Sequence, residues 1–211
     1  FLGVLEEDGK RLKKGDRVVC YPLLTCGHCL ACRTGNEHVC NSLGLIGIDR
    51  DGGMAESVCV DENLLFRVPD GVSDRAAVVT EPLAVIVHSM VQAQVQPLDC
   101  AVVMGAGPIG ILTGIVLQHL GASRVFISDV FDKRLDLARE LGMTPVNPTK
   151  EDFVKIVKDA TDGEGCDTLF ECSGAESAAL QMTQLTRVRG KICQTGVHKK
   201  PHLVDLQAIN F

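Results

Sequence analysis

Four cysteines with the spacing of a metal site stand near the start of the sequence: Cys26, Cys29, Cys32 and Cys40. Thiolates bind zinc in a tetrahedron, and the two short steps bring three sulfur atoms to one point before the chain returns with the fourth. Four thiolates fill the tetrahedron and leave no open position. We therefore expect a structural zinc ion rather than a catalytic one.

Other interpretations of this cluster stay open. A disulfide or unligated core cysteines fit less well, because bridges between cysteines so close in sequence are strained and the loop is polar. An iron–sulfur cluster is the main rival, although Asn41 follows the last cysteine where a ferredoxin run has proline. A zinc ribbon that binds nucleic acid fits poorly with the net charge of −6.

A second pattern with chemical meaning is the glycine-rich turn Gly105-Ala106-Gly107-Pro108-Ile109-Gly110. In a dinucleotide-binding turn, Gly105 would allow the sharp bend, Gly107 would let the backbone approach the pyrophosphate, and Gly110 would let helix and strand pack closely. Pro108 and Ile109 would open the helix whose N-terminal dipole attracts the phosphates. An apolar run precedes this turn and a helical pattern follows it, which is the context that the motif requires.

Asp129 ends the next apolar run, 19 residues after Gly110. An acidic residue near this distance accepts hydrogen bonds from the adenosine ribose. Its charge would repel the 2′-phosphate of NADP, so we expect NAD as the cofactor. The alternative is a glycine turn that binds no nucleotide, with Asp129 capping a helix.

Glu81 interrupts an apolar stretch, since residues 76–79 precede it and residues 84–87 follow it. We expect such a carboxylate to lie partly buried near a domain junction, where it needs a cation or a hydrogen-bond donor. The alternative is a carboxylate in the first turn of a helix, stabilised by the helix dipole. His88 falls on about the same helical face, but packing or a surface contact is a commoner role for it than metal binding.

The elements around these motifs divide the chain into two parts. Residues 1–80 hold short β-like runs at 16–20, 55–60 and 64–68, and they indicate an all-β domain with the cysteine loop, 26–40, as its long loop. Residues 81–211 alternate strand and helix patterns: strands are expected at 100–105, 124–129, 167–171 and 191–195, and helices at 108–120, 131–141, 151–160 and 175–185. Repeated βα units indicate a parallel sheet covered on both faces, so the predicted class is all-β plus α/β.

The composition is that of a folded globular protein, with 45% hydrophobic and 23% charged residues. The negative charge argues against nucleic acid as a partner, and no apolar run reaches the roughly 18 residues of a membrane span. The six cysteines outside the cluster lie mostly in apolar runs, where cysteine acts as a small hydrophobe. A reducing cytoplasm fits both groups of cysteines.

In combination, these motifs resemble the zinc-containing medium-chain alcohol dehydrogenases, in the branch of sorbitol, butanediol and threonine dehydrogenases. The resemblance rests on the cysteine loop, the glycine turn with Asp129, and residues 15–19, 52–56 and 81–84. It covers essentially the whole chain and implies a GroES-like β domain joined to a Rossmann domain, both partial. It also implies hydride transfer between NAD and a secondary alcohol or polyol. The alternative is a non-catalytic NAD-binding protein that keeps only the structural zinc.

The resemblance implies a second, catalytic zinc bound by a Cys, a His, often a Glu, and a residue at the position of Glu81. We expect the upstream ligands to precede Phe1, both ends of the chain to be cut, and the fragment alone to show little turnover. Glu81 would then bind this zinc or hold its water. A homodimer or homotetramer is implied as well.

Looser matches concern the two ends of the bound cofactor. By resemblance, Arg134 would lie against the adenine. Cys172 and its neighbours 173–174, together with Thr195 and Val197, would line the nicotinamide end.

Overall fold

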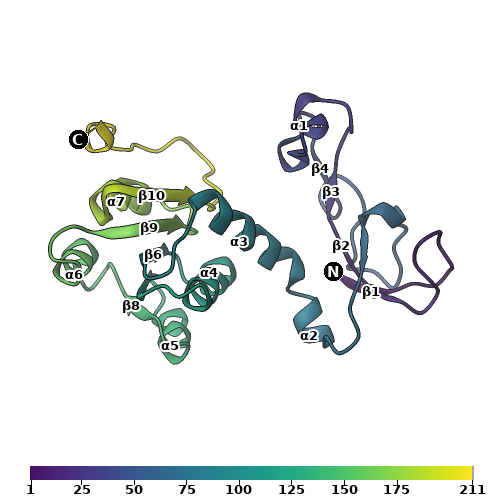
Figure 1. Cartoon of the computed structure of the whole chain (residues 1–211), viewed down its shortest axis with the longest axis horizontal. Helices are drawn as coiled ribbons and strands as arrows, with labels where there is room; N and C mark the ends of the chain where they lie inside the picture. Colours follow the sequence, from purple (N-terminus) through teal and green to yellow (C-terminus); the bar gives the residue numbers. More distant parts are fainter. Residues whose placement is uncertain (211) are drawn as a thin grey trace. The chain divides into compact units, whose positions relative to one another are not determined.

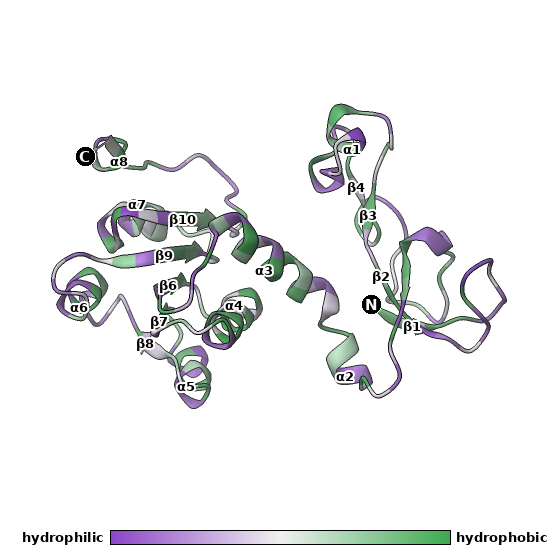
Figure 2. Ribbon diagram, in the orientation of Figure 1, coloured by the Kyte–Doolittle hydropathy of each residue, from purple (hydrophilic) through white to green (hydrophobic). Residues whose placement is uncertain are grey.

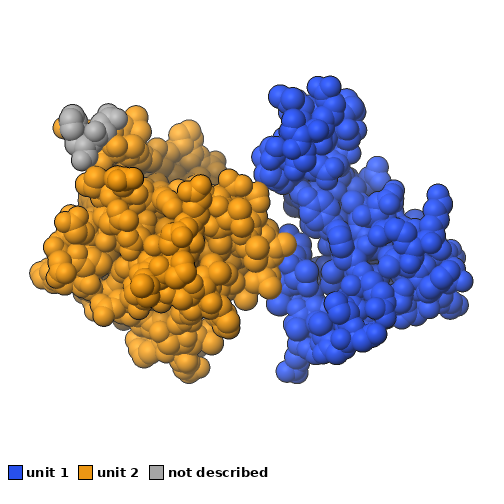
Figure 3. Space-filling model, in the orientation of Figure 1, with its two compact units in different colours: residues 1–81 blue, residues 82–211 orange. Residues whose placement is uncertain are grey.

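The computed structural model of the chain describes residues 1–210 and divides into two compact units, Phe1–Glu81 and Pro82–Phe211 (Figure 3). The point of division falls in helix α3, Thr80–Ala93. The first unit is mostly strand and loop, and the second alternates strands and helices. The predicted class of an all-β part plus an α/β part is confirmed.

The first unit is built on a three-stranded antiparallel sheet in the order β1-β2-β5 (Figure 1). The strands are β1 Leu2–Val4, β2 Arg17–Cys20 and β5 Leu65–Arg67. Alternation along β2 places Val18 and Cys20 in a small core with Leu12 and Leu65. The short helices of this unit are α1 Leu30–Arg33, η1 Glu37–Val39, η2 Glu62–Leu64 and α2 Asp74–Ala77.

The strand predicted at 55–60 is wrong. Residues 53–60 form bends and extended coil, and in the described part of the chain no backbone hydrogen bond joins residues 54–60 to another segment. The alternation of apolar and polar residues is present in the sequence. A strand, however, needs a partner for its N–H and C=O groups, and in the described part of the chain residues 55–60 pair with neither edge of the β1-β2-β5 sheet.

The second unit is built on five parallel strands in the order β10-β9-β6-β7-β8. The strands are β6 Cys100–Met104, β7 Arg124–Ser128, β8 Thr144–Val146, β9 Cys166–Glu171 and β10 Thr186–Gln194. Counted along the chain from β6, this order runs 3-2-1-4-5 from the β8 edge, which is the doubly wound arrangement. The strand order reverses between β6 and β9, where ligands bind in such sheets.

Two hydrophobic clusters cover the two faces of this sheet. On one face, Ala101 and Val103 of β6 pack with α3, α4 Pro108–His119 and α5 Asp132–Glu140. On the other, Val102 and Met104 pack with α6 Phe153–Asp159 and α7 Glu176–Leu185. Figure 2 shows β6 in the green of hydrophobic residues. Burial on both faces explains why the strands read as continuous apolar runs in the sequence.

The helices and strands expected in this unit are present within a few residues, except at β10, and the structure adds β8, which the sequence analysis did not predict. That strand begins at Thr186, directly after α7, and shifts register between Thr186 and Lys191. The chain closes with α8, Gln207–Asn210. Among the described residues, no helix combines the length and apolar character needed to cross a lipid bilayer.

Candidate functional site

The cysteine loop is closed at its base by the antiparallel pair β3 Leu23–Leu24 and β4 Gly44–Leu45. Cys26 and Cys29 precede α1, with Cys29 at its N-cap, and Cys32 lies within it. Cys40 is the C-cap of η1. The first turn of α1 therefore separates Cys29 from Cys32, and η1 lies between Cys32 and Cys40. The structure brings all four predicted cysteines together, with every Sγ within 4.8 Å of the others.

The distances within the cluster fit a tetrahedral metal. Zinc–sulfur bonds of about 2.3 Å place neighbouring sulfur atoms about 3.8 Å apart in a tetrahedron. The Sγ of Cys32 lies 4.0 Å from that of Cys26 and 3.5 Å from that of Cys29, and the Sγ atoms of Cys29 and Cys40 are 4.0 Å apart. These separations are far too long for disulfide bonds, and all four cysteines are free.

Backbone N–H groups point at the sulfur atoms. The amides of Cys26 and Ser42 donate to Cys40 Sγ, each at 3.4 Å, and the amide of Cys29 donates to Cys26 Sγ at 3.4 Å. Hydrogen bonds from the backbone of Cys32 and Asn41 lower the pKa of the Cys29 thiol from 9.0 to about 6. Donors of this kind favour the thiolate, which is the form that binds a metal.

The glycine turn connects β6 to α4 at the carboxyl edge of the parallel sheet. Gly105 has φ +101°, a backbone conformation that residues with a side chain rarely adopt. Gly107 is the N-cap of α4, with no side-chain cap, and a Cβ at Gly107 would meet no atom within 4 Å. The N-terminus of α4 therefore faces open space, with room for an anionic group to approach the backbone.

Gly110 allows the close contact that the motif requires. A Cβ at Gly110 would stand 1.8 Å from the carbonyl oxygen of Gly105 and 3.3 Å from a methyl group of Val103. Only the absence of a side chain lets the first turn of α4 pack against the turn and the strand. The two ends of the motif thus hold each other in place.

Asp129 lies buried beside this turn, at the end of β7. Its Oδ2 accepts a hydrogen bond of 2.9 Å from the amide of Ala106, and its Oδ1 accepts one of 3.0 Å from the amide of Phe131. Arg134 pairs with it at 3.2 Å and stacks over the ring of Phe131, 4.9 Å from its centroid. Because α5 takes Phe131 as its N-cap, Asp129 is not the helix cap that the alternative required.

The segments expected at the nicotinamide end lie side by side at the switch point. The amide of Cys172 donates to Met104 of β6, and its Sγ lies 3.4 Å from the hydroxyl of Thr195. A Cβ at Gly174 would stand 2.5 Å from the carbonyl oxygen of Val197. Val197 itself is exposed. The predicted residues therefore come from two adjacent turns, 172–174 after β9 and 195–197 after β10.

One residue of this region was missed by the sequence reasoning. Glu171, the last residue of β9, has a relative exposure of 0% although it is acidic. Its carboxylate accepts hydrogen bonds from Ser173 in the first turn and from Gln194, the residue immediately before the second turn. The available signal was an acidic residue at the end of an apolar run immediately before Cys172-Ser173-Gly174.

The expected burial of Glu81 is wrong. Glu81 is exposed in the first turn of α3. Its flanking apolar residues lie on a helix, so those at helical spacing, such as Ile86 and Met90, enter the core while Glu81 points away. Within residues 1–210, the cysteine cluster is the sole group of three or more side chains placed to hold a metal.

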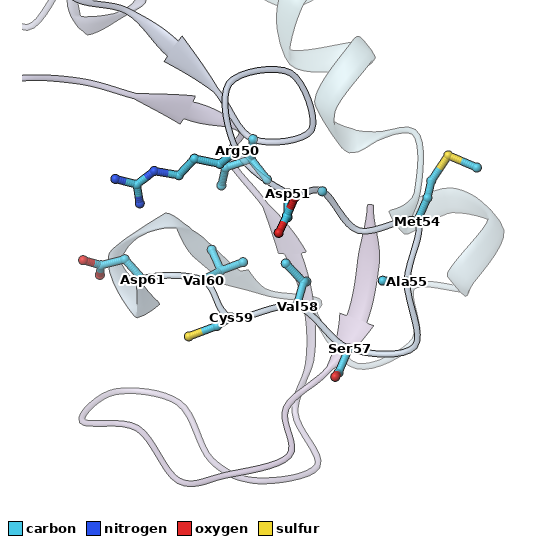
Figure 4. Close-up of a pocket in the computed structure, with 11 residues that line it drawn as sticks. Arg50, Asp51, Met54, Ala55, Ser57, Val58, Cys59, Val60 and Asp61 are labelled. Atoms are coloured by element: carbon cyan, nitrogen blue, oxygen red, sulfur yellow. The ribbon is translucent and has the colours of Figure 1, made fainter.

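A hollow of about 750 Å³ lies along the segment that failed to form a strand. Arg50, Cys59 and Asp61 extend toward the same side of it in the view of Figure 4. It contains none of the predicted site residues. We assign it no function.

Comparison with known families gives two matches along the chain. The family described as "Alcohol dehydrogenase GroES-like domain" matches residues 1–70, and the family described as "Zinc-binding dehydrogenase" matches residues 108–210. The first match contains the cysteine cluster. The second contains Asp129 and begins at the first residue of α4.

Individual relatives agree with these matches. L-threonine 3-dehydrogenase of Pseudoalteromonas atlantica is 34% identical over 215 residues, which are 100% of this chain and 63% of that protein. A protein assigned as a zinc-binding dehydrogenase from Sinorhizobium meliloti 1021, bound to NADP, has a TM-score of 0.93 at 28% identity, covering 100% of this chain and 64% of that one. An alcohol dehydrogenase from Escherichia coli CFT073, complexed with NADH, has a TM-score of 0.91 at 28% identity, covering 100% and 63%. The chain thus spans less than two thirds of the length of these relatives.

Proposed function

Because the chain belongs to the family of zinc-containing medium-chain alcohol dehydrogenases, we propose that it works in hydride transfer between NAD and a secondary alcohol or polyol. The observation that carries this proposal is the glycine turn at the β6–β9 switch point, with the buried Asp129 beside it. The name of the threonine relative supports the substrate class, since carbon 3 of threonine carries a secondary hydroxyl.

The residues of the second unit would bind NAD from one end to the other. The N-terminus of α4, from Gly107 through Pro108, Ile109 and Gly110, would hold the pyrophosphate. Asp129 would accept hydrogen bonds from the adenosine ribose. When bound, the cofactor supplies the hydride acceptor at its nicotinamide ring.

The remaining cofactor residues stand around these groups. Arg134, already stacked on Phe131, would cover the adenine. Cys172, Thr195 and Val197 would line the nicotinamide end, where β9 and β10 finish.

The cysteine cluster would hold a structural zinc ion that fixes the loop between β3 and β4. Its sulfur–sulfur distances and its backbone donors support this assignment. Glu81 would take part in the catalytic metal site of the complete enzyme, where zinc lowers the pKa of the bound alcohol. Support for Glu81 is the family resemblance alone, since the carboxylate is exposed in the chain.

The choice of NAD over NADP would depend on Asp129, and similar structures bind either form. Asp129→Asn removes the negative charge while keeping the shape of the side chain. We expect the variant to lose its preference for NADH over NADPH, with NADH binding weakened about tenfold. Titration calorimetry of the chain with each reduced cofactor measures this, and Asp132→Asn, on the exposed start of α5, is the matched control. An unchanged preference would argue against this role for Asp129.

The overall proposal is tested on the complete protein that contains this chain. We expect NAD reduction with a panel of secondary alcohols and polyols, threonine and butanediol included, and two zinc ions per subunit. One zinc per subunit and NADH binding without turnover would favour the non-catalytic alternative. We further propose a cytoplasmic homodimer or homotetramer, which light scattering of the complete protein distinguishes.

A further inference from the structure

The buried carboxylate of Glu171 is the strongest feature that the proposed site does not use. It stands at the end of β9, on the strand beside the switch point. A buried carboxylate without partners is costly, so its partners show what it does.

Its two carboxylate oxygens divide their hydrogen bonds between two turns. Oε1 accepts from the amide of Ser173 at 2.8 Å, from the amide of Gly174 at 3.0 Å and from the Ser173 hydroxyl. Oε2 accepts from the side-chain amide of Gln194 at 2.9 Å and from the amide of Gly174 at 3.2 Å, and it lies 3.1 Å from Nε2 of His198. The bonds from Ser173 and Gly174 fix the turn after β9, and the contacts with Gln194 and His198 fix the turn after β10.

The backbone of Glu171 strengthens the same bridge. Its carbonyl oxygen accepts hydrogen bonds from the amides of Thr195 and Gly196, at 2.9 Å and 2.7 Å. The fit around the carboxylate is close, because a Cβ at Gly196 would stand 2.5 Å from Oε2. Glu171 thus forms hydrogen bonds that fix both turns, through its side chain and through its backbone.

The glycine turn touches the same structure. A Cβ at Gly105 would stand 3.0 Å from the Cβ of Ser173, so the bend after β6 abuts the turn that Glu171 fixes. Three connections at the carboxyl edge, after β6, β9 and β10, therefore depend on one another. Glu171 is the group that ties two of them together.

We propose that Glu171 is a positioning residue that fixes turns 172–174 and 195–197, the second through the flanking Gln194 and His198, in the arrangement that receives the nicotinamide half of the cofactor. This inference rests on the proposed function. Every side-chain partner of Glu171 is a donor or can act as one, so an ionised carboxylate satisfies all of them, whereas an amide of the same shape turns an NH₂ group toward one set of donors. The adenine half binds around Asp129 and lies outside this network.

The test compares two ligands on the 211-residue chain. NADH carries the nicotinamide, and ADP-ribose carries the same adenine, pyrophosphate and ribose groups without it. For Glu171→Gln we expect NADH to bind about tenfold more weakly and ADP-ribose to bind within twofold of the unmodified chain. The fluorescence of bound NADH should shift toward that of the free cofactor, because the ring is no longer held.

Two further variants separate positioning from simple loss of stability. Glu171→Gln combined with Gln194→Glu returns an acceptor to the NH₂ group of residue 171 and should recover part of the NADH affinity. Glu176→Gln removes an exposed carboxylate at the start of α7 and should leave both affinities unchanged. If Glu171→Gln fails to fold, Gln194→Ala is the substitute, because it removes one donor to Oε2. It should weaken NADH binding selectively as well, by a smaller factor.

The outcomes distinguish this inference from the proposed function. Equal weakening of NADH and ADP-ribose, or no weakening of either, would overturn the positioning role and leave the proposed function standing. Failure of the unmodified chain to bind NADH would overturn the proposed function, and the positioning role with it.

Discussion

The two units of the chain bury very different amounts of apolar side chain. Among the described residues, the hydrophobic core cluster of the first unit has four buried members, which are Leu12, Val18, Cys20 and Leu65. The second unit has clusters of fourteen and twelve buried residues, one on each face of its sheet. A core as small as the first seldom stabilises a domain alone, and such domains usually need a metal or disulfides. A bound metal would therefore contribute to stability chiefly in the first unit.

The two units also differ in where their hydrogen-bonded carboxylates lie. In the first unit, Glu62 accepts hydrogen bonds from three consecutive backbone amides, those of Lys10, Arg11 and Leu12, near the surface. In the second, Glu171 accepts its hydrogen bonds in a fully buried position. One carboxylate holds a loop that solvent reaches, and the other holds the turns of the proposed cofactor site.

The largest expected effect comes from removing the metal site. Cys29→Ser should abolish zinc binding, and the free energy lost is on the order of 10 kcal/mol for a structural zinc site. We expect the cysteine loop to become sensitive to protease while the second unit keeps its NADH affinity. Zinc content by mass spectrometry and limited proteolysis measure the two effects, with Cys59→Ser as control. Loss of NADH affinity in Cys29→Ser would contradict the expectation that the second unit binds NADH without the metal site.

A smaller effect is expected within the second unit from Gly110→Ala. The added methyl group would meet the Gly105 carbonyl at 1.8 Å, so the turn must shift, at a cost of about 1–3 kcal/mol. Thermal unfolding of the chain measures the change. Gly107→Ala is the matched control, because its methyl group meets open space. It should leave stability unchanged and weaken NADH binding by occupying the pyrophosphate position, and unchanged NADH affinity in Gly107→Ala would argue against that position.

Glu62 gives the first unit a pH dependence. Backbone hydrogen bonds from Arg11, Leu12 and Lys10 lower the pKa of its carboxylate below 4.5. A lowered pKa in the folded state stabilises the fold above the unfolded pKa, and the stabilisation is lost as pH falls through the folded pKa. Glu62→Gln should therefore lower the melting temperature of the first unit at pH 7, and the difference from the unmodified chain should disappear as the pH falls through the lowered pKa of Glu62. Glu7→Gln, exposed in the same unit, should show no such difference.

The smallest effect concerns thiol reactivity and leaves stability untouched. Burial raises the pKa of Cys172 to about 11 and that of Cys166 to about 12, so both remain protonated and slow to react at neutral pH. Cys59 of the first unit is exposed. Iodoacetamide followed by peptide mass spectrometry should find Cys59 modified before Cys166 and Cys172. Early modification of Cys172 would show that the turns at the switch point open more readily than the structure indicates.

Local sequence patterns were enough to predict the elements whose cause is local. The spacing of the four cysteines predicted one loop with converging sulfur atoms, and the glycine turn predicted a strand, a bend and a helix in that order. These patterns depend on backbone conformation over a few residues, which neighbouring residue types control. The parallel sheet was predicted because strands that are buried on both faces appear as continuous apolar runs, here alternating with helical patterns.

Features that depend on a partner distant in sequence could be seen only in the folded chain. The alternation at 55–60 could not reveal that this segment lacks a strand to pair with, and the apolar neighbours of Glu81 could not reveal that the side chain points to solvent. Glu171 shows the same limit most clearly. Its donors, Ser173 and Gln194, are 21 residues apart in sequence and meet because β9 and β10 are neighbours in the sheet. The free-energy cost of burying a carboxylate depends on the hydrogen-bond donors around it. For Glu171 those donors are known only once the complete fold is known.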